Sequence, residues 1–223
     1  VAGEFRDLRA LTRSWRVAPA SEPGVVEVKH GRLQTGFRVS EEALSFDAVR
    51  VTAGRGTSEL DAVARFGRTG GYSIRWRGQV DLDAMGSVAS IPWAGLAQVD
   101  GTISAPIYTN PRIVARGTRI EGFRFLDLDL GNVAADVLYG PDFLMRIQDA
   151  QGVKGQSRFR GEGVVDLEPF PAKVLSSSFE AEGRVKDLLD AVRDYVPSTR
   201  ILRDRLDGDL WVSGTASGPA GVL

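Results

Sequence analysis

Residues 117–131 read GTRIEGFRFLDLDLG, and the run FLDLDLG within them shows the pattern that decides the fold. Leu126, Leu128 and Leu130 alternate with Asp127 and Asp129, which is the period of a β-strand with one apolar and one charged face. Similar alternation recurs along nearly the whole chain, and Gly and Pro interrupt it at about the 8-to-12-residue spacing of an all-β protein. The sequence therefore predicts strands almost throughout, with little helix to cover their apolar side.

The composition excludes several classes of protein. The chain has 223 residues, a formal net charge of −1, one histidine and no cysteine. Such a chain lacks the strong basic surface of a nucleic-acid binder, and without thiols it has no disulfides, thiolate metal sites or cysteine nucleophiles. No run approaches the ~18 apolar residues of a membrane-spanning helix. Because the N-terminus has neither Met nor the regions of a signal peptide, we expect an internal piece of a longer protein.

The chain offers little for catalysis. His30 is expected in a hairpin turn and no Gly-x-Ser-x-Gly elbow occurs, so a Ser–His–Asp site is not indicated. Two carboxylate pairs, Asp81 with Asp83 and Asp127 with Asp129, are each spaced two residues apart on expected strands. We expect each pair to hydrate an outer face rather than to face a partner across a cleft, as a glycosidase requires. We therefore expect no enzyme activity, no cofactor and no metal site.

The chain divides into a short leading segment and a long repetitive one. The leading segment, 1–24, is expected to form a short amphipathic helix over Phe5–Trp15 followed by a linker. The remainder, 25–223, is expected to form one repetitive β domain. Its repeat units run over about 46–106 and 125–219, because both contain an Arg-aromatic-Arg-Gly strand followed by a Val-Asp-Leu step.

The second repeat unit contains a helical insert that the first lacks. The spacing of apolar residues over 186–206 predicts helix, with Pro197 ending a first helix and Ser198 capping a second. We expect this insert to connect two strands.

Alternate residues along the strands define one apolar and one charged face. The apolar face can be removed from water in two ways. The sheet either closes into a β-sandwich with a dry core, or curls part-way and leaves an apolar groove that a ligand can fill. The expected apolar face comprises Val49, Val51, Leu60, Phe66, Tyr72, Ile74, Trp76, Leu126, Leu128, Leu130, Phe143, Met145, Ile147, Phe159, Val165 and Leu167. The expected polar face comprises Asp47, Arg50, Asp61, Arg65, Arg75, Arg77, Asp127, Asp129, Arg146, Arg158, Arg160 and Asp166.

A series of short motifs follows a fixed order between Val25 and Leu223. A Gly-Thr strand breaks at proline in GTISAP and GTASGP, a Gly-Thr-x-Ile-Glu-Gly strand begins at Gly117, and a Phe/Leu-x-Leu-Asp-Leu strand follows. A Val-Asp-Leu-x-Pro-Phe step and a short helix then lead into Leu-x-Gly-x-Leu-x-Val-x-Gly. In this order the motifs resemble the TamB/AsmA-like family of bacterial envelope proteins.

The resemblance implies a long, curved β-sheet folded lengthwise like a taco, with an open hydrophobic groove. It implies a periplasmic section of an inner-membrane-anchored protein that spans the envelope of a Gram-negative bacterium. The groove would conduct phospholipids between the inner and outer membranes, and the apolar residues given above would line it. The membrane anchor, and the part that contacts an outer-membrane barrel protein of the TamA/BamA type, would lie outside this chain. No nucleic-acid partner is expected.

Two alternatives from other classes stay open. The sheet could be a scaffold that assists the assembly of outer-membrane β-barrel proteins, such as autotransporters, by pairing with their strands at its edges. It could also be a closed β-sandwich that binds an unknown ligand on its surface. The scaffold would depend on backbone groups at edge strands, whereas the lipid groove would depend on residues such as Leu128.

Overall fold

The computed structural model describes residues 2–12, 24–84, 87–88, 91–106, 109–125, 128–168, 173–191, 202 and 205–219. These residues form one antiparallel sheet with the strand order β1-β2-β3-β4-β5-β7-β8-β9-β10-β11-β12-β13, and β6 pairs with β7 outside this path. The elements are β1 (Ala2–Thr12), β2 (Gly24–Val39), β3 (Ala43–Ala53), β4 (Gly56–Arg65), β5 (Gly71–Asp81), β6 (Ser87–Val88), β7 (Ile91–Pro106), β8 (Arg112–Phe125), β9 (Leu128–Tyr139), β10 (Leu144–Lys154), β11 (Ser157–Asp166), β12 (Lys173–Arg184), α1 (Val185–Ala191) and β13 (Asp209–Pro219).

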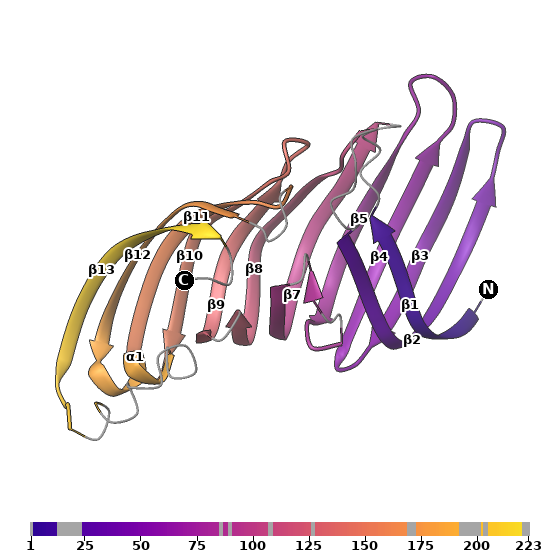
Figure 1. Ribbon diagram of the computed structural model, residues 1–223. Coiled ribbons are helices and arrows are strands. Elements are labelled where there is room, and N and C mark those ends of the chain that lie inside the picture. Colours follow the sequence, from indigo (N-terminus) through magenta and orange to yellow (C-terminus); the bar gives the residue numbers. More distant parts are fainter. Residues whose placement is uncertain are drawn as a thin grey trace.

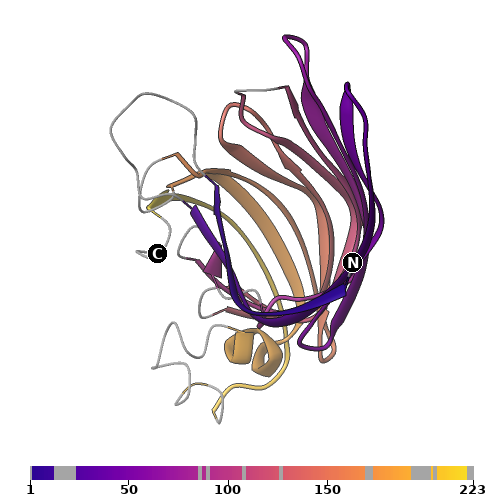
Figure 2. The same cartoon turned by 90° about the vertical axis from the view of Figure 1, so that its right-hand side faces the viewer.

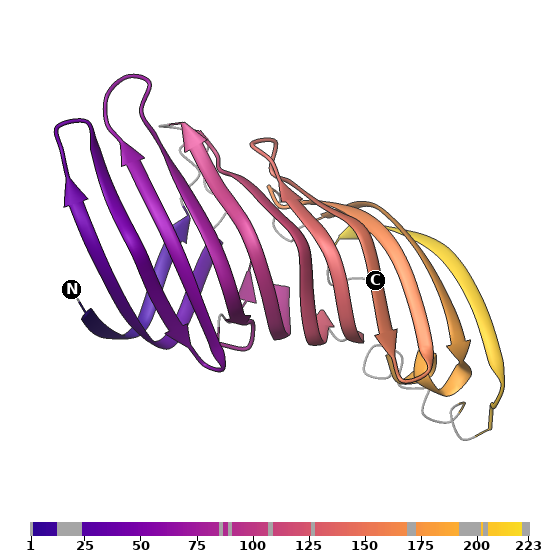
Figure 3. The same cartoon turned by 180° about the vertical axis from the view of Figure 1, so that it is seen from behind.

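The sheet is elongated, curved and open. Its strands lie side by side along one axis (Figure 1). The view along that axis shows the strands bent into a C-shaped section, with α1 inside the bend (Figure 2). Figure 3 looks onto the convex side. The edge strands β1 and β13 stand at opposite ends of the strand order. The prediction of a curved, open all-β sheet is confirmed, and the alternative of a closed β-sandwich was wrong.

Extra residues inserted into the strands explain part of the bend. The pairing register shifts within β3–β4 and β8–β9, and the inserted residues Ala48 and Gly117 have φ of 49° and 57°. Side chains of the next strand bind their backbone N–H groups: Ala48 donates to Asp61 at 3.0 Å and Gly117 to Asp136 at 2.7 Å. Such β-bulges bend a strand and increase its twist. Carboxylates on the strands therefore help to hold the curvature.

The N-terminal residues form two paired strands, β1 and β2, where the sequence predicted a helix and a turn. The helix expected over Phe5–Trp15 was wrong, because β1 pairs with β2 from Ala2 opposite Gln34 onward. A short isolated helix is marginally stable in water, whereas pairing with a long strand satisfies the backbone of β1 along one side. His30 lies inside β2, opposite Arg6, so the expected hairpin turn at His30 was also wrong. Residues 13–15 of the expected helix lie outside the described residues.

The run FLDLDLG spans a reversal of the chain rather than one strand. β8 ends at Phe125, β9 begins at Leu128, and these two residues are register partners. Leu126 and Asp127 lie outside the described residues. The prediction of a single strand was wrong because the alternation of Leu and Asp continues across the point where the chain turns.

The helical insert begins at the end of β12. α1 covers Val185–Ala191, so the predicted helix starts within one residue of its expected position. The expected break at Pro197 and the expected cap at Ser198 lie outside the described residues. Asp187, in the first turn of α1, accepts a hydrogen bond from the backbone N–H of Gln156 at 2.7 Å. This bond ties the helix to the turn between β10 and β11.

Gly161 and Gly163 predict a difference in stability between two substitutions in one strand. Both lie in β11, two residues apart, and so share one face of the sheet. A Cβ on Gly161 would lie 2.6 Å from the backbone oxygen of Ser178, whereas the nearest atom to a Cβ on Gly163 would lie at 3.6 Å. We expect Gly161→Ala to lower the free energy of unfolding by about 1–3 kcal/mol, and Gly163→Ala to change it by less than ~0.5 kcal/mol. Urea unfolding measures both, and equal losses would contradict the close approach of the two backbones.

Candidate functional site

One face of the sheet carries a continuous layer of apolar side chains. In the central strands, Val80, Ala97, Val99 and Ala115 are buried against one another, and Trp76 packs against them. They occupy alternate positions of β5, β7 and β8, and the pairing register brings them opposite one another. Alternate residues of a strand point to the same side, so this group belongs to a single face.

This apolar layer lies on the concave side of the sheet. A second group forms around Met145 and Val165, and Val137 packs against both groups. Ser157 stands an even number of residues before Val165 in β11 and therefore shares its face. The Ser157 hydroxyl donates to Asp187 of α1 at 3.2 Å. Since α1 lies inside the bend in Figure 2, we name this side the concave face and the opposite side the convex face.

Most of the predicted lining residues lie on the concave face. The register of β4 with β5 runs without a shift, so Leu60 stands opposite Trp76 and the predicted alternation holds there. The predicted residues on the concave face are Val49, Val51, Leu60, Tyr72, Ile74, Trp76, Leu128, Met145, Ile147, Phe159, Val165 and Leu167. Their contact with lipid stays a prediction.

Four predicted residues are placed differently. Phe66 follows the end of β4, and Phe143 lies in the turn between β9 and β10 with φ of 61°. The pairing of β8 with β9 skips Leu130, which precedes the positive-φ residue Gly131. Leu126 lies outside the described residues. Turns and bulges interrupt the alternation of faces, which a pattern read along the sequence does not register.

Large apolar side chains on the concave face remain exposed to solvent. Tyr72 in β5 is 38% exposed and Phe179 in β12 is 44% exposed. Phe37 and Val212, in β2 and β13, are also exposed. The register places Phe37 opposite Phe46 and so on the same face. The exposed apolar side chains of this face therefore lie in β2 and β5 and in β12 and β13, on either side of the buried apolar layer of the central strands.

The concave face is nearly free of charge. Among the described side chains of its strands the one charged group is Lys154 at the end of β10, whose Nζ lies 2.5 Å from the carboxylate of Asp129, and α1 adds Asp187, which accepts from Ser157. Burial raises the pKa of the Tyr72 hydroxyl. A face of this kind suits an apolar ligand.

An aromatic cluster on this face was missed in the sequence. Trp93 and Phe125 meet edge to face with ring centroids 5.4 Å apart, and Phe123 lies 6.1 Å from Trp93. The cluster joins the ends of β7 and β8, and Phe125 packs against the group around Met145. The alternating Phe residues of GFRFL were a usable signal, because two residues spaced by two on a strand share a face.

Two phenylalanine rings lie over glycines of the neighbouring strand. A Cβ on Gly152 would collide with the ring of Phe159, and a Cβ on Gly214 would lie 2.8 Å from the ring of Phe179. Each ring thus occupies the place where a side chain of the next strand would stand. This arrangement covers the glycine backbone with apolar surface, and the rings lie flat against the concave face.

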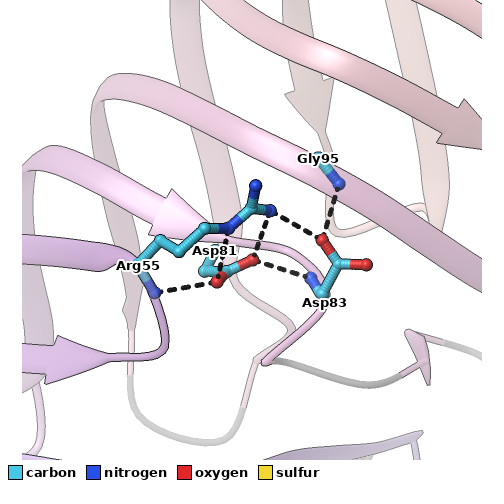
Figure 4. Close-up of polar contacts among 4 residues, drawn as sticks. All are labelled: Arg55, Asp81, Asp83 and Gly95. Carbon is cyan, nitrogen blue, oxygen red and sulfur yellow. Dashed lines mark hydrogen bonds and ion pairs between the residues drawn. The ribbon is translucent and has the colours of Figure 1, made fainter.

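An ion pair between the exposed Arg55 and the buried Asp81 joins the turn after β3 to the end of β5 (Figure 4). The Asp81 side chain is 6% exposed and accepts from the Arg55 backbone N–H at 2.8 Å and from Nε at 3.1 Å. Arg55 also donates to Asp83 at 2.8 Å, and Asp83 accepts from the N–H of Gly95 at 3.2 Å. The hydrogen bond from the Arg55 side chain is the main cause that lowers the pKa of Asp81 to about 2. Asp81 therefore locks strands together, and the expectation that it hydrates an outer face was wrong.

The convex face carries charges that alternate in sign between strands. Arg50 donates to Glu59 at 2.8 Å, and Glu59, Arg77 and Asp100 are successive register partners in β4, β5 and β7. Opposite charges in facing positions stabilise neighbouring strands modestly. The predicted polar residues on this face are Asp47, Arg50, Asp61, Arg65, Arg75, Arg77, Arg146, Arg158, Arg160 and Asp166. Asp129 instead pairs with Lys154, and Asp127 lies outside the described residues.

Over the residues that the structure describes, no three or more His, Asp or Glu side chains are grouped so that they could hold a metal ion. Over those residues there is also no helix with the length and apolar character needed to cross a membrane.

In comparisons with known proteins, no family model, no curated protein and no solved structure matched the chain. The resemblance to the TamB/AsmA-like family therefore stays a prediction.

Proposed function

We propose that the concave face binds the acyl chains of phospholipids and lets them pass along the sheet between the two membranes of a bacterial envelope. The observation that carries this proposal is the open, nearly uncharged apolar face, on which Tyr72 and Phe179 remain exposed. Exposed apolar patches larger than a few hundred Å² normally mark binding surfaces.

The energetics suit a conduit better than a single tight site. Each methylene moved out of water gains about 0.8 kcal/mol, so a two-chain lipid is held strongly in total. Neighbouring positions along the concave face are chemically alike, because aliphatic and aromatic side chains follow one another from strand to strand. A bound acyl chain therefore exchanges one apolar contact for another as it shifts, and no covalent step is required.

The length of the face allows more than one lipid at a time. The main path of the sheet contains twelve strands, from β1 to β13 without β6. At a spacing of about 4.8 Å, these strands extend over ~50 Å. One leaflet of a bilayer contributes half of a hydrocarbon core of ~30 Å, so the face is about three times as long as one set of acyl chains.

The surroundings of the chain in this proposal follow from the family resemblance. The chain is a periplasmic section of a protein that is attached to the inner membrane by a segment outside this sequence. A barrel protein of the TamA/BamA type in the outer membrane is the proposed partner at the far end. Phospholipid acyl chains are the proposed ligand, and no cofactor is required.

One observation favours a second candidate function. β13 is an edge strand, so one side of its backbone has no partner within the described sheet. Leu210 and Val212 of β13 are exposed as well. An exposed apolar edge strand can accept a further strand, which is what a scaffold for outer-membrane β-barrel assembly would use. This function would depend on the backbone of β13 and little on Tyr72.

Lipid extraction from vesicles tests the proposal. The chain is incubated with vesicles of phosphatidylethanolamine and phosphatidylglycerol, re-isolated, and examined by native mass spectrometry. We expect phospholipid adducts, with more than one lipid on a single chain, because of the length of the concave face. A folded chain that carries no lipid after incubation would contradict acyl-chain binding and would favour the scaffold.

A further inference from the structure

The convex face has a second feature, a shallow valley over strands β8–β13 that is lined by charged, polar and apolar residues. Its largest segment has a volume of about 940 Å³ and its outermost segment about 490 Å³. Successive segments share lining residues: Arg158 and Trp211 belong to the first two, and Gln151 and Arg160 connect the largest to the third. The segments therefore form one elongated depression that runs along the strands, on the side viewed in Figure 3.

An exposed tryptophan stands in this valley. Trp211 in β13 is 62% exposed, whereas the other tryptophans of the described residues, Trp76 and Trp93, pack into the apolar groups of the concave face. Arg158, Glu182 and Trp211 are successive register partners in β11, β12 and β13. Trp211 thus shares one row across the strands with Glu182 in the next strand and Arg158 in the strand beyond it, and both of these side chains are exposed.

The valley has no net charge in its largest segment, and the other three segments add Asp149, Glu162, Asp209 and Arg146. The largest segment is lined by three arginines and three glutamates, including the hydrogen-bonded pair Arg160 and Glu180, with 2.8 Å from Nε to the carboxylate. Balanced charges of this kind give no net attraction for a polyanion or a polycation. The remaining lining combines apolar residues, such as Val153, with amides and hydroxyls, such as Gln151 and Ser178, which donate and accept hydrogen bonds without charge.

We propose that this valley binds an uncharged, hydroxyl-rich chain, namely a neutral oligosaccharide. The indole of Trp211 can pack against the apolar C–H face of a sugar ring, while Arg158 and Glu182 hydrogen-bond to neighbouring hydroxyl groups. An elongated depression fits a chain of rings better than a single small molecule. This site is independent of acyl-chain binding, because it lies on the opposite face of the sheet.

An extended peptide fits the valley less well than a glycan does. A peptide that binds to a sheet gains most from backbone hydrogen bonds at a free strand edge. The backbones of β11 and β12 at the valley floor already pair with their neighbours on both sides. A ligand in the valley is therefore bound by side chains. The hydroxyl groups of a glycan can bond to side chains alone, whereas an extended peptide gains most by pairing with free backbone groups.

Fluorine NMR of the chain labelled with 5-fluorotryptophan tests the site. The sequence contains four tryptophans, and Trp211→Phe assigns the resonance of Trp211. Linear hexasaccharides of glucose, N-acetylglucosamine and xylose are added to millimolar concentration, with heparin and an uncharged decapeptide as comparison ligands. We expect at least one neutral hexasaccharide to shift the Trp211 resonance and to leave the Trp76 and Trp93 resonances in place.

Variants separate the site from a general surface effect. Trp211→Ala and Arg158→Ala are each expected to weaken the affinity for that hexasaccharide about tenfold, which calorimetry measures. Arg75→Ala, on the convex face outside the valley, is the control and is expected to bind as the unaltered chain does. The proposal is overturned if no neutral hexasaccharide shifts the Trp211 resonance, or if only heparin or the peptide does.

Discussion

Asp81→Asn is expected to lower the free energy of unfolding by about 2 kcal/mol at neutral pH. The physical reason is the ion pair with Arg55, which reaches the buried Asp81 carboxylate through its backbone N–H, Nε and Nη2. These bonds favour the charged carboxylate and lower its pKa from 3.8 to about 2. The amide of asparagine keeps the shape of the side chain but loses the charge that these donors stabilise. Urea unfolding of the chain measures the difference.

The same substitution is expected to change the dependence of stability on pH. A carboxylate with a lowered pKa in the folded state contributes stability that is fully present above its unfolded pKa, near 4. That contribution is lost as pH falls through the folded pKa of Asp81, about 2. The stability curves of the unaltered chain and of Asp81→Asn should therefore lie about 2 kcal/mol apart at pH 6 and converge as pH approaches 2.

Asp83→Asn is the matched control for this effect. Asp83 also pairs with Arg55, at 2.8 Å, but its side chain is 55% exposed, so solvent screens the interaction. We expect a loss of less than ~1 kcal/mol. Equal losses for Asp81→Asn and Asp83→Asn, or a gap that does not close at low pH, would show that the pairing of Arg55 with the buried Asp81 does not hold the strands together.

A charge on the concave face is expected to reduce lipid binding more than tenfold. Phe179→Asp places a carboxylate where an apolar ring now lies over Gly214, and an acyl chain that covers it would remove the charge from water. Phe179 is 44% exposed in the free chain, so the carboxylate stays hydrated there and folding is preserved. Transfer of pyrene-labelled phosphatidylethanolamine from vesicles to the chain measures the effect.

Ser178→Asp provides the comparison for Phe179→Asp. Ser178 is the adjacent residue of β12, it is exposed, and it points to the convex face. The same charge is thus introduced one residue away on the opposite side, and lipid transfer is expected to stay as in the unaltered chain. Circular dichroism checks that both variants remain folded. If Ser178→Asp impairs transfer as much as Phe179→Asp does, the concave face is not the lipid path.

The sequence predicted the faces correctly where strands pair without a register shift. β4 and β5 pair residue for residue from Ser58 to Arg65, and there the alternation alone places Leu60, Ile74 and Trp76 on one face. The openness of the sheet came from the family resemblance, because alternation is equally compatible with a sandwich. A curved sheet needs inserted residues, and Ala48 shows that such a residue leaves no distinct mark in the pattern.

The errors arose where tertiary pairing overrides a local pattern. In FLDLDLG the alternation runs through a chain reversal, so Phe125 and Leu128 belong to two different strands. The apolar spacing of Phe5 and Leu8 suits a helix, yet the backbone of β1 pairs with β2. Asp81 looked like one of many surface carboxylates, and its partner Arg55 lies in a different turn. A sequence read along the chain does not show which strands are neighbours, and each of these features depends on that.

Photo-crosslinking in cells that produce the protein tests acyl-chain binding by the concave face most directly. The photoreactive residue is placed at Tyr72 and, separately, at Ser73. The two positions are adjacent in β5 and both exposed, but Tyr72 lies on the concave face and Ser73 on the convex face. Acyl-chain binding predicts phospholipid adducts at Tyr72 and none at Ser73. The absence of lipid adducts at Tyr72 with full incorporation, or equal adducts at both positions, would contradict the proposal that the concave face binds phospholipid.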